Sequence, residues 1–264
     1  MDQKLRHLRC DQWAAKDPNG AAVFRIGLCG VFHRSRLRAD PLPRLAMRKN
    51  PMSKSLIQAA QVFYKDLVAN NAKVWWVAHR GTYDDVLKPA ALALMDDLAP
   101  AISDLVDAPV KPKLFRPHRD VRFSKDKTPY KTHLHMMWTL EGVGRQNPVF
   151  FFGVGVDYVT VGSGMMGFDK PVLEDWRKFV DLDAKRIIGI VDGIEADGFK
   201  LREPALKRVP AAYPADHPAA HLLRMKSCVA SKDIGQPADL RGAILQACEQ
   251  IAPLTNLLVQ ISEA

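Results

Sequence analysis

The chain has 264 residues, of which 47% are hydrophobic and 25% charged, and its formal net charge is +9. This balance is typical of a globular protein with a sizeable core, and the absence of a run of about 18 apolar residues argues against a membrane span. None of the four cysteines lies in a CxxC pair, which excludes a disulfide framework and a zinc ribbon and favours a reducing, cytoplasmic location.

Residues 1–51 differ from the rest of the chain. They hold 11 Lys and Arg against 4 Asp and Glu, a local charge of +7, and show no sustained helical or strand periodicity. We interpret them as a basic, disordered extension, or as a sign that the natural start is Met52. Residues 52–264 hold 27 cations against 25 acids, so the body carries only +2.

Helical periodicity begins directly after this segment. The spacing of Leu56, Phe63 and Leu67 predicts an amphipathic helix over residues 53–71. Asn70-Asn71 should end that helix and cap the next one, which Pro89 is expected to kink or split. Trp75, Trp76 and Tyr83 recur at helical spacing in this second helix, so we expect them in the core.

Residues 113–123 are expected to be extended. A strand here would turn Phe115, Val121 and Phe123 toward the core and the polar alternate residues outward or into a cleft. Arg119 would then lie on the apolar side and need a buried acceptor.

Further strand patterns follow at 134–142 and 148–164, and helical periodicity returns over 170–198. A short helix, a strand and a closing helix complete the chain. This order predicts an α+β fold, in which an antiparallel sheet of several strands is flanked by N- and C-terminal helices. Residues 52–264 would form a single domain.

The strongest functional signal is a cluster of charges. Residues 113–131 carry seven Lys and Arg against two Asp, a local +5. Arg presents a planar fork of donors that suits phosphate or carboxylate, so we predict a cleft that binds a small anionic molecule. Its predicted ligand-binding residues are Arg116, Arg119, Arg122, Ser124, Asp126, Lys127, Lys131 and Lys226, and its predicted catalytic residues are Asp120, as a base, and Tyr130, as an acid.

Two alternatives remain open at this point. The charged motif could be a structural ion-pair network in a non-catalytic interaction domain. Nucleic-acid binding is a second alternative, with residues 1–51 as an electrostatic arm, but the near-neutral body argues against it because a long polyanion needs a spread basic stripe.

No cofactor or metal is predicted. The GSGMMG stretch (162–167) matches a dinucleotide fingerprint by letters, but no βαβ pattern surrounds it, so a glycine-rich turn is the better interpretation. The pairs His133/His135 and His217/His221 each share a face, yet neither has a further ligand at metal spacing.

Three blocks of sequence carry a family resemblance. They are Asn70-Asn71 followed by Trp75 and Tyr83, the RxxRDxRFSxDKxPYK pattern from Arg116 to Lys131, and LKRVPAAYPADHPAAHLLRMKS over 206–227. In order and spacing they resemble the domain-of-unknown-function family 2461 over about residues 54–262. Trp76 stands where that family has Phe, and Arg80 where it has Lys. The resemblance implies membership of the family and brings no activity with it.

Overall fold

An antiparallel sheet forms the centre of the computed structural model, which describes residues 52–264. The expectations for residues 1–51 lie outside this range. The six strands are β1 (Val110–Leu114), β2 (Leu134–Leu140), β3 (Val149–Val154), β4 (Val159–Met165), β5 (Lys200–Leu201) and β6 (Cys228–Asp233). They lie in the order β1-β2-β3-β4-β6-β5, with every neighbouring pair antiparallel. The predicted α+β class is therefore confirmed.

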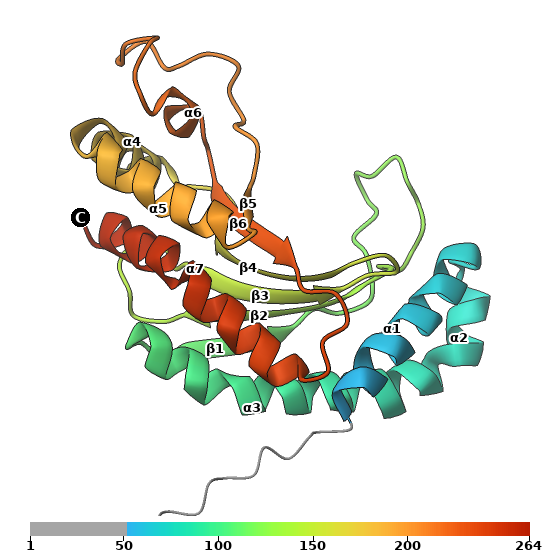
Figure 1. Ribbon diagram of the computed structural model, residues 1–264. Helices are drawn as coiled ribbons and strands as arrows, with labels where there is room; N and C mark the ends of the chain where they lie inside the picture. The colour runs from blue at the N-terminus through green and yellow to red at the C-terminus, as the bar shows by residue number, and fades with distance from the viewer. Residues whose placement is uncertain (1–51) are drawn as a thin grey trace, which may run out of the picture. The chain divides into compact units, whose positions relative to one another are not determined.

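Helices precede these strands, lie between β4 and β6, and follow the last strand. They are α1 (Met52–Ala69), α2 (Lys73–Thr82), the π-helical turn η1 (Tyr83–Leu87), α3 (Lys88–Val106), α4 (Lys170–Leu182), α5 (Ala184–Ala196), α6 (Ala220–Leu223) and α7 (Leu240–Glu263). Figure 1 shows α3 and α7 running along one side of the sheet, with α1 and α2 at one end and α4 and α5 at the other. In the described part of the chain, no helix is long and apolar enough to cross a membrane.

The sheet has one covered and one open face. In β2, Leu134, Met136 and Trp138 are buried, whereas the alternate residues His135 and Met137 are only half-buried. The buried set packs toward the helices, because the indole N–H of Trp138 donates to the backbone carbonyl of Met95 in α3 at 3.1 Å. Period-two alternation thus separates a dry face from a face that is left partly accessible.

The second predicted helix is divided, as expected, and a π-helical turn separates its two parts. The backbone N–H of Lys88 donates to the carbonyl of Tyr83, five residues earlier, which makes a single π turn between α2 and α3. Pro89 follows in the first turn of α3, where its missing N–H is tolerated. Helical structure therefore runs without a gap from α2 through η1 into α3.

The glycine-rich stretch is a strand and not a turn, which corrects our interpretation. Gly162, Ser163 and Gly164 lie inside β4, and the hydroxyl of Ser163 is 2.6 Å from that of Thr255 in α7. The antiparallel neighbours of β4 leave no βαβ unit for a dinucleotide. The glycines matter for the open face, as described below.

Candidate functional site

The cation-rich segment is mostly an irregular loop. The strand expected over residues 113–123 ends at Leu114, and only the bridge between His118 and Tyr130 pairs the two arms of the loop. The prediction was wrong beyond Leu114, and Phe123, which we expected in the core, is 96% exposed. Extended pairing fails here because two aspartates bind backbone N–H groups two residues ahead, in the turn geometry that competes with strands.

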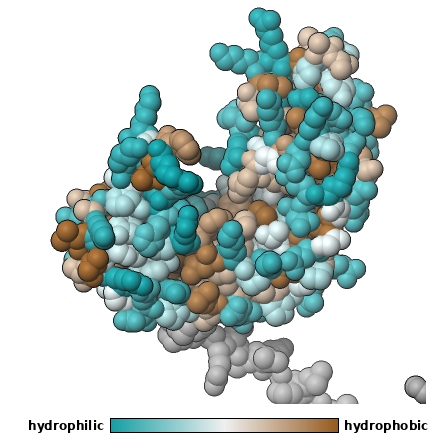
Figure 2. All heavy atoms as spheres, turned by 180° about the vertical axis from the view of Figure 1, so that it is seen from behind, coloured by the Kyte–Doolittle hydropathy of each residue, from teal (hydrophilic) through white to brown (hydrophobic). Residues whose placement is uncertain are grey.

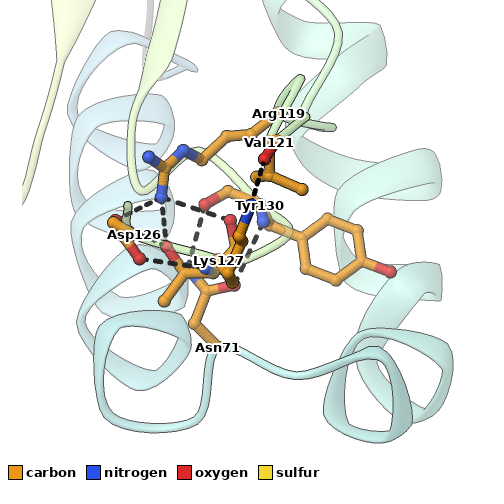
Figure 3. Close-up of polar contacts among 7 residues, drawn as sticks. Asn71, Arg119, Val121, Asp126, Lys127 and Tyr130 are labelled. Atoms are coloured by element: carbon orange, nitrogen blue, oxygen red, sulfur yellow. Dashed lines mark hydrogen bonds and ion pairs between the residues drawn. The ribbon is translucent and has the colours of Figure 1, made fainter. Parts of the chain in front are cut away.

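Within residues 119–128, here called the paired loop, three of the four cations have an acceptor in the loop, and Figure 3 shows the contacts of Arg119 and Lys127. The guanidinium of Arg119 donates to Asp126 at 2.5 Å and also to the hydroxyl of Thr128. The guanidinium of Arg122 holds both oxygens of Asp120, at 2.9 and 2.6 Å. The ammonium of Lys127 donates to the carbonyl of Val121 at 3.0 Å.

These pairs explain the low carboxyl pKa values. The backbone N–H of Thr128, followed by the Arg119 guanidinium, lowers the pKa of Asp126 to about 2. The guanidinium of Arg122 lowers the pKa of Asp120. A general base that works near neutral pH needs a raised pKa, so the geometry gives Asp120 the properties of an orienting partner for Arg122.

Asn71 fixes the far end of this segment. Its side-chain amide donates to the carbonyl of Tyr130 at 2.9 Å, and its side-chain carbonyl accepts the backbone N–H of Tyr130 at 3.1 Å. We had expected Asn71 to cap α2, but Ala72 occupies the cap position. The Asn71 side chain therefore joins the α1–α2 turn to a residue 59 positions away.

Tyr130 is held between helix and loop. It is 5% exposed and its ring stacks on Trp76 of α2, with centroids 4.4 Å apart and planes inclined by 15°. His118 lies 5.1 Å from the same tyrosine ring. Trp76 and Tyr83 are buried, as predicted from their spacing.

These rings border a groove of about 620 Å³, which we call the aromatic groove. One wall comes from α2, η1 and α3, and the other from the chain between β1 and the paired loop. It is lined by Lys73, Trp76, Val77, Arg80, Tyr83, Asp84, Lys88, Leu92, Leu114, Phe115, Arg116, Pro117, His118 and Tyr130. Four cations therefore face one carboxylate, Asp84, which is already paired with Arg80 at 2.7 Å.

Two further cations, Lys113 and Lys131, lie next to the groove and, like Arg116, have no acid partner in the described chain. The ammonium groups of Lys113 and Lys131 lie 5.3 and 5.1 Å from the centroid of the Phe115 ring, and Arg116 follows that residue. Burial, and then Arg116 and Lys113, lower the pKa of Lys131. Between residues 56 and 264, no carboxylate lies within 4.0 Å of any of the three. We call Lys113, Arg116 and Lys131 the cation cluster.

The two remaining predicted residues lie elsewhere. Ser124 is at the tip of the paired loop, where its backbone N–H donates to Val121. Lys226 is exposed and precedes β6, whose first residue, Cys228, pairs with Met165. Leu114, by contrast, is aligned across the paired strands with Lys232, which lies near the other end of β6. The structure therefore does not bring Lys226 to the cation cluster, because the two lie at opposite ends and opposite edges of the sheet.

Residues 59–260 match the family described as "Conserved hypothetical protein (DUF2461)". The chain belongs to this family. The match covers about three quarters of the sequence, and no curated protein matches the chain.

In this DUF2461 protein, two of the three sequence blocks lie far apart in the chain but meet in the fold. The first block, with Asn71 and Trp76, meets the second, with Arg116 and Tyr130, around the aromatic groove. The third block packs against α4 instead, where the indole N–H of Trp176 donates to the carbonyl of Leu222 at 3.0 Å. Sequence reasoning missed Lys73 and Lys88 as groove residues, since isolated lysines on a helix carry no signal until the partner wall is known.

Proposed function

We propose that the aromatic groove binds a small anionic molecule of phosphate or carboxylate type. Arg116 supplies the directional contact, Lys73 and Lys88 supply further positive charge, and the stacked pair of Trp76 and Tyr130 forms an apolar wall. The observation that carries the proposal is the contrast in pairing: in the described residues Arg116, Lys73 and Lys88 have no acid partner, whereas the arginines of the paired loop do.

The physical argument is electrostatic. Like charges that share a partly enclosed groove repel one another more strongly than they do in water, and an anion between them removes that cost. Arginine adds direction, because its planar fork matches the oxygens of phosphate or carboxylate. A π turn in the wall is consistent with this role, since such turns frequently occur at functional sites.

This proposal changes the roles of the predicted residues. Arg119, Arg122 and Lys127 hold the paired loop in shape, with Asp120 and Asp126 as their partners. Arg116 remains a ligand-binding residue, and Tyr130 is the predicted catalytic residue that lines the groove. Of the two predicted catalytic residues, only Tyr130 could therefore take part in a proton transfer in the groove.

The test is thermal denaturation with phosphate, pyrophosphate, sugar phosphates and dicarboxylates, for the wild type, Arg116→Ala and Arg122→Ala. We expect at least one anion to raise the melting temperature of the wild type and of Arg122→Ala, and to have no effect on Arg116→Ala. Arg122 is a matched control, since it is an arginine six positions away that is already held by Asp120. Equal stabilisation of all three proteins, or of none, would contradict the proposal.

One observation favours the second candidate, a non-catalytic interaction domain. The Arg119–Asp126–Thr128 contacts and the Asn71–Tyr130 clamp satisfy polar groups within the protein, as a structural network does. On that alternative, Arg119→Ala lowers the melting temperature, and no anion stabilises the wild type.

A further inference from the structure

A second hollow lies on the open face of the sheet, next to the aromatic groove, with which it shares Phe115. Figure 2 shows the molecule hollowed between two lobes, with hydrophobic residues at the bottom and hydrophilic ones along the sides. On this face a cavity of about 650 Å³ is lined by residues from four strands and the loops beside them, among them Phe151, His135, Met137 and Ser231. This is the size of a small-molecule site.

Two aromatic rings lie across neighbouring strands here. A Cβ placed on Gly162 would overlap the tip of the Phe151 ring, and one on Gly153 would lie 2.6 Å from Cδ2 of His135. Each ring therefore covers a glycine of the adjacent strand, and only glycine leaves room for it. The imidazole of His135 also stacks on His133, with centroids 3.9 Å apart, and bonds the hydroxyl of Tyr158 at 2.9 Å.

The charge along the rim has a single sign. Lys200 and Arg202 line the cavity at the β5 edge, and no carboxylate appears among its lining residues in the described chain. Arg202 donates only to the carbonyl and the sulfur of Met166, at 3.4 and 3.5 Å, so its guanidinium has no acid partner there. Burial lowers the pKa of His135 to about 4, which keeps its ring neutral near pH 7 and suited to stacking.

We infer that the open face binds a mononucleotide, with the base stacked on Phe151 beside His135 and the phosphate held by Lys200 and Arg202. Planar aromatic faces stack on nucleobases with little preference for sequence, and cations supply the phosphate contact. A free nucleotide fits better than a nucleic-acid strand, because the cavity volume of about 650 Å³ is that of a small-molecule site and residues 52–264 carry only +2.

Calorimetric titration of the full chain carrying Arg116→Ala, which removes the directional contact of the aromatic groove, with AMP, ATP, adenosine, ribose 5-phosphate and tripolyphosphate tests this inference. We expect AMP or ATP to bind, and adenosine and ribose 5-phosphate to bind at least about tenfold more weakly, because each lacks one of the two contacts. Tripolyphosphate that binds as well as ATP would overturn the inference in favour of a simple charge effect. An oligothymidylate that binds far more tightly than any mononucleotide would overturn it in favour of single-stranded nucleic acid.

Variants locate the site. Phe151→Leu keeps an apolar side chain but removes the ring face, and should weaken nucleotide binding about tenfold. The double substitution Lys200→Ala/Arg202→Ala should weaken it at least as much and reduce its salt dependence. Lys111→Ala is the control, because Lys111 lies on β1 outside the cavity and pairs with Glu141 at 3.7 Å.

A second control distinguishes binding at this site from binding in the aromatic groove. Arg116→Ala should abolish the anion response of the groove and leave nucleotide affinity unchanged, so the two proposals can fail independently. Circular dichroism of each variant confirms that it folds. Undetectable nucleotide binding at millimolar concentration, or an unchanged affinity in folded Phe151→Leu, would overturn the inference.

Discussion

The paired loop and the cation cluster belong to the same basic stretch of sequence but differ in how their charges are satisfied. In the paired loop, Arg119 holds a carboxylate seven residues away, and Arg122 holds one two residues away. In the cation cluster, Lys113 and Lys131 lie near the Phe115 ring and Arg116 follows it in the sequence, and none of the three has a carboxylate within 4.0 Å in the described chain. Charge density in a sequence therefore does not identify a binding site, because the local partners decide which cations remain available.

The largest expected effect tests what anchors this basic stretch to the α1–α2 turn. Asn71→Ala removes both hydrogen bonds to the partly buried backbone of Tyr130, and should lower the free energy of unfolding by about 2–3 kcal/mol. Urea denaturation measures this change. Asn70→Ala is the matched control, since Asn70 makes one exposed bond to the carbonyl of Asp66 and should cost less than about 1 kcal/mol. Equal losses in the two variants would show that the hydrogen bonds between Asn71 and Tyr130 contribute no more than one exposed hydrogen bond.

A second prediction concerns pH and the open face. The pKa of His135 in the folded protein is about 4, below the 6.5 of a free imidazole, because burial disfavours the charged ring. The unfolded chain then binds a proton more readily, so stability that is complete above pH 6.5 is lost as pH falls from 6.5 toward 4. His135→Asn should remove a pH-dependent contribution on the order of 2 kcal/mol in this window.

The paired loop should respond in a different pH window. The folded-state pKa of Asp126 is about 2, against 3.8 for a free carboxyl, so its contribution is present above pH 3.8 and lost as pH falls toward 2. Melting temperatures of the wild type and Asp126→Asn over this range measure the effect. If both proteins lose stability identically, the loop pairing contributes nothing.

Within the paired loop, the more buried arginine should matter more. Arg119, whose side chain is 27% exposed, bonds Asp126 and Thr128, and Arg119→Ala should cost about 1–2 kcal/mol of unfolding free energy. Arg122, at 76% exposure, should show no resolvable change when it is replaced by Ala. The reverse order would contradict our description of the loop.

The smallest expected effect is at Phe123. Its ring is 96% exposed, so Phe123→Ser should change the free energy of unfolding by less than about 0.5 kcal/mol. A larger loss in urea denaturation would mean that the ring is buried in solution, as the strand pattern predicted.

The hydrophobic patterns predicted most of the fold correctly. The strands over 134–142 and 148–164 and the helices on either side of them follow from periodicity, because burial of one face imposes a period of two or 3.6 on the residues. The pattern failed at residues 115–123, where Asp120 and Asp126 bind the backbone locally and outcompete strand pairing. A pattern of hydrophobic residues alone does not reveal this competition between local hydrogen bonds and strand pairing.

By itself, the sequence determined the α+β class, the family and the presence of a positively charged focus. Only the tertiary structure decided which cations are paired, since Asp126 reaches Arg119 through a turn and Lys73 reaches the groove from a helix. It also decided that Asn71 binds Tyr130, 59 residues away, and that Gly162 makes room for Phe151. The physical reason is that periodicity reports the environment of each residue along its own element, whereas a binding site depends on distances between elements that no local pattern encodes.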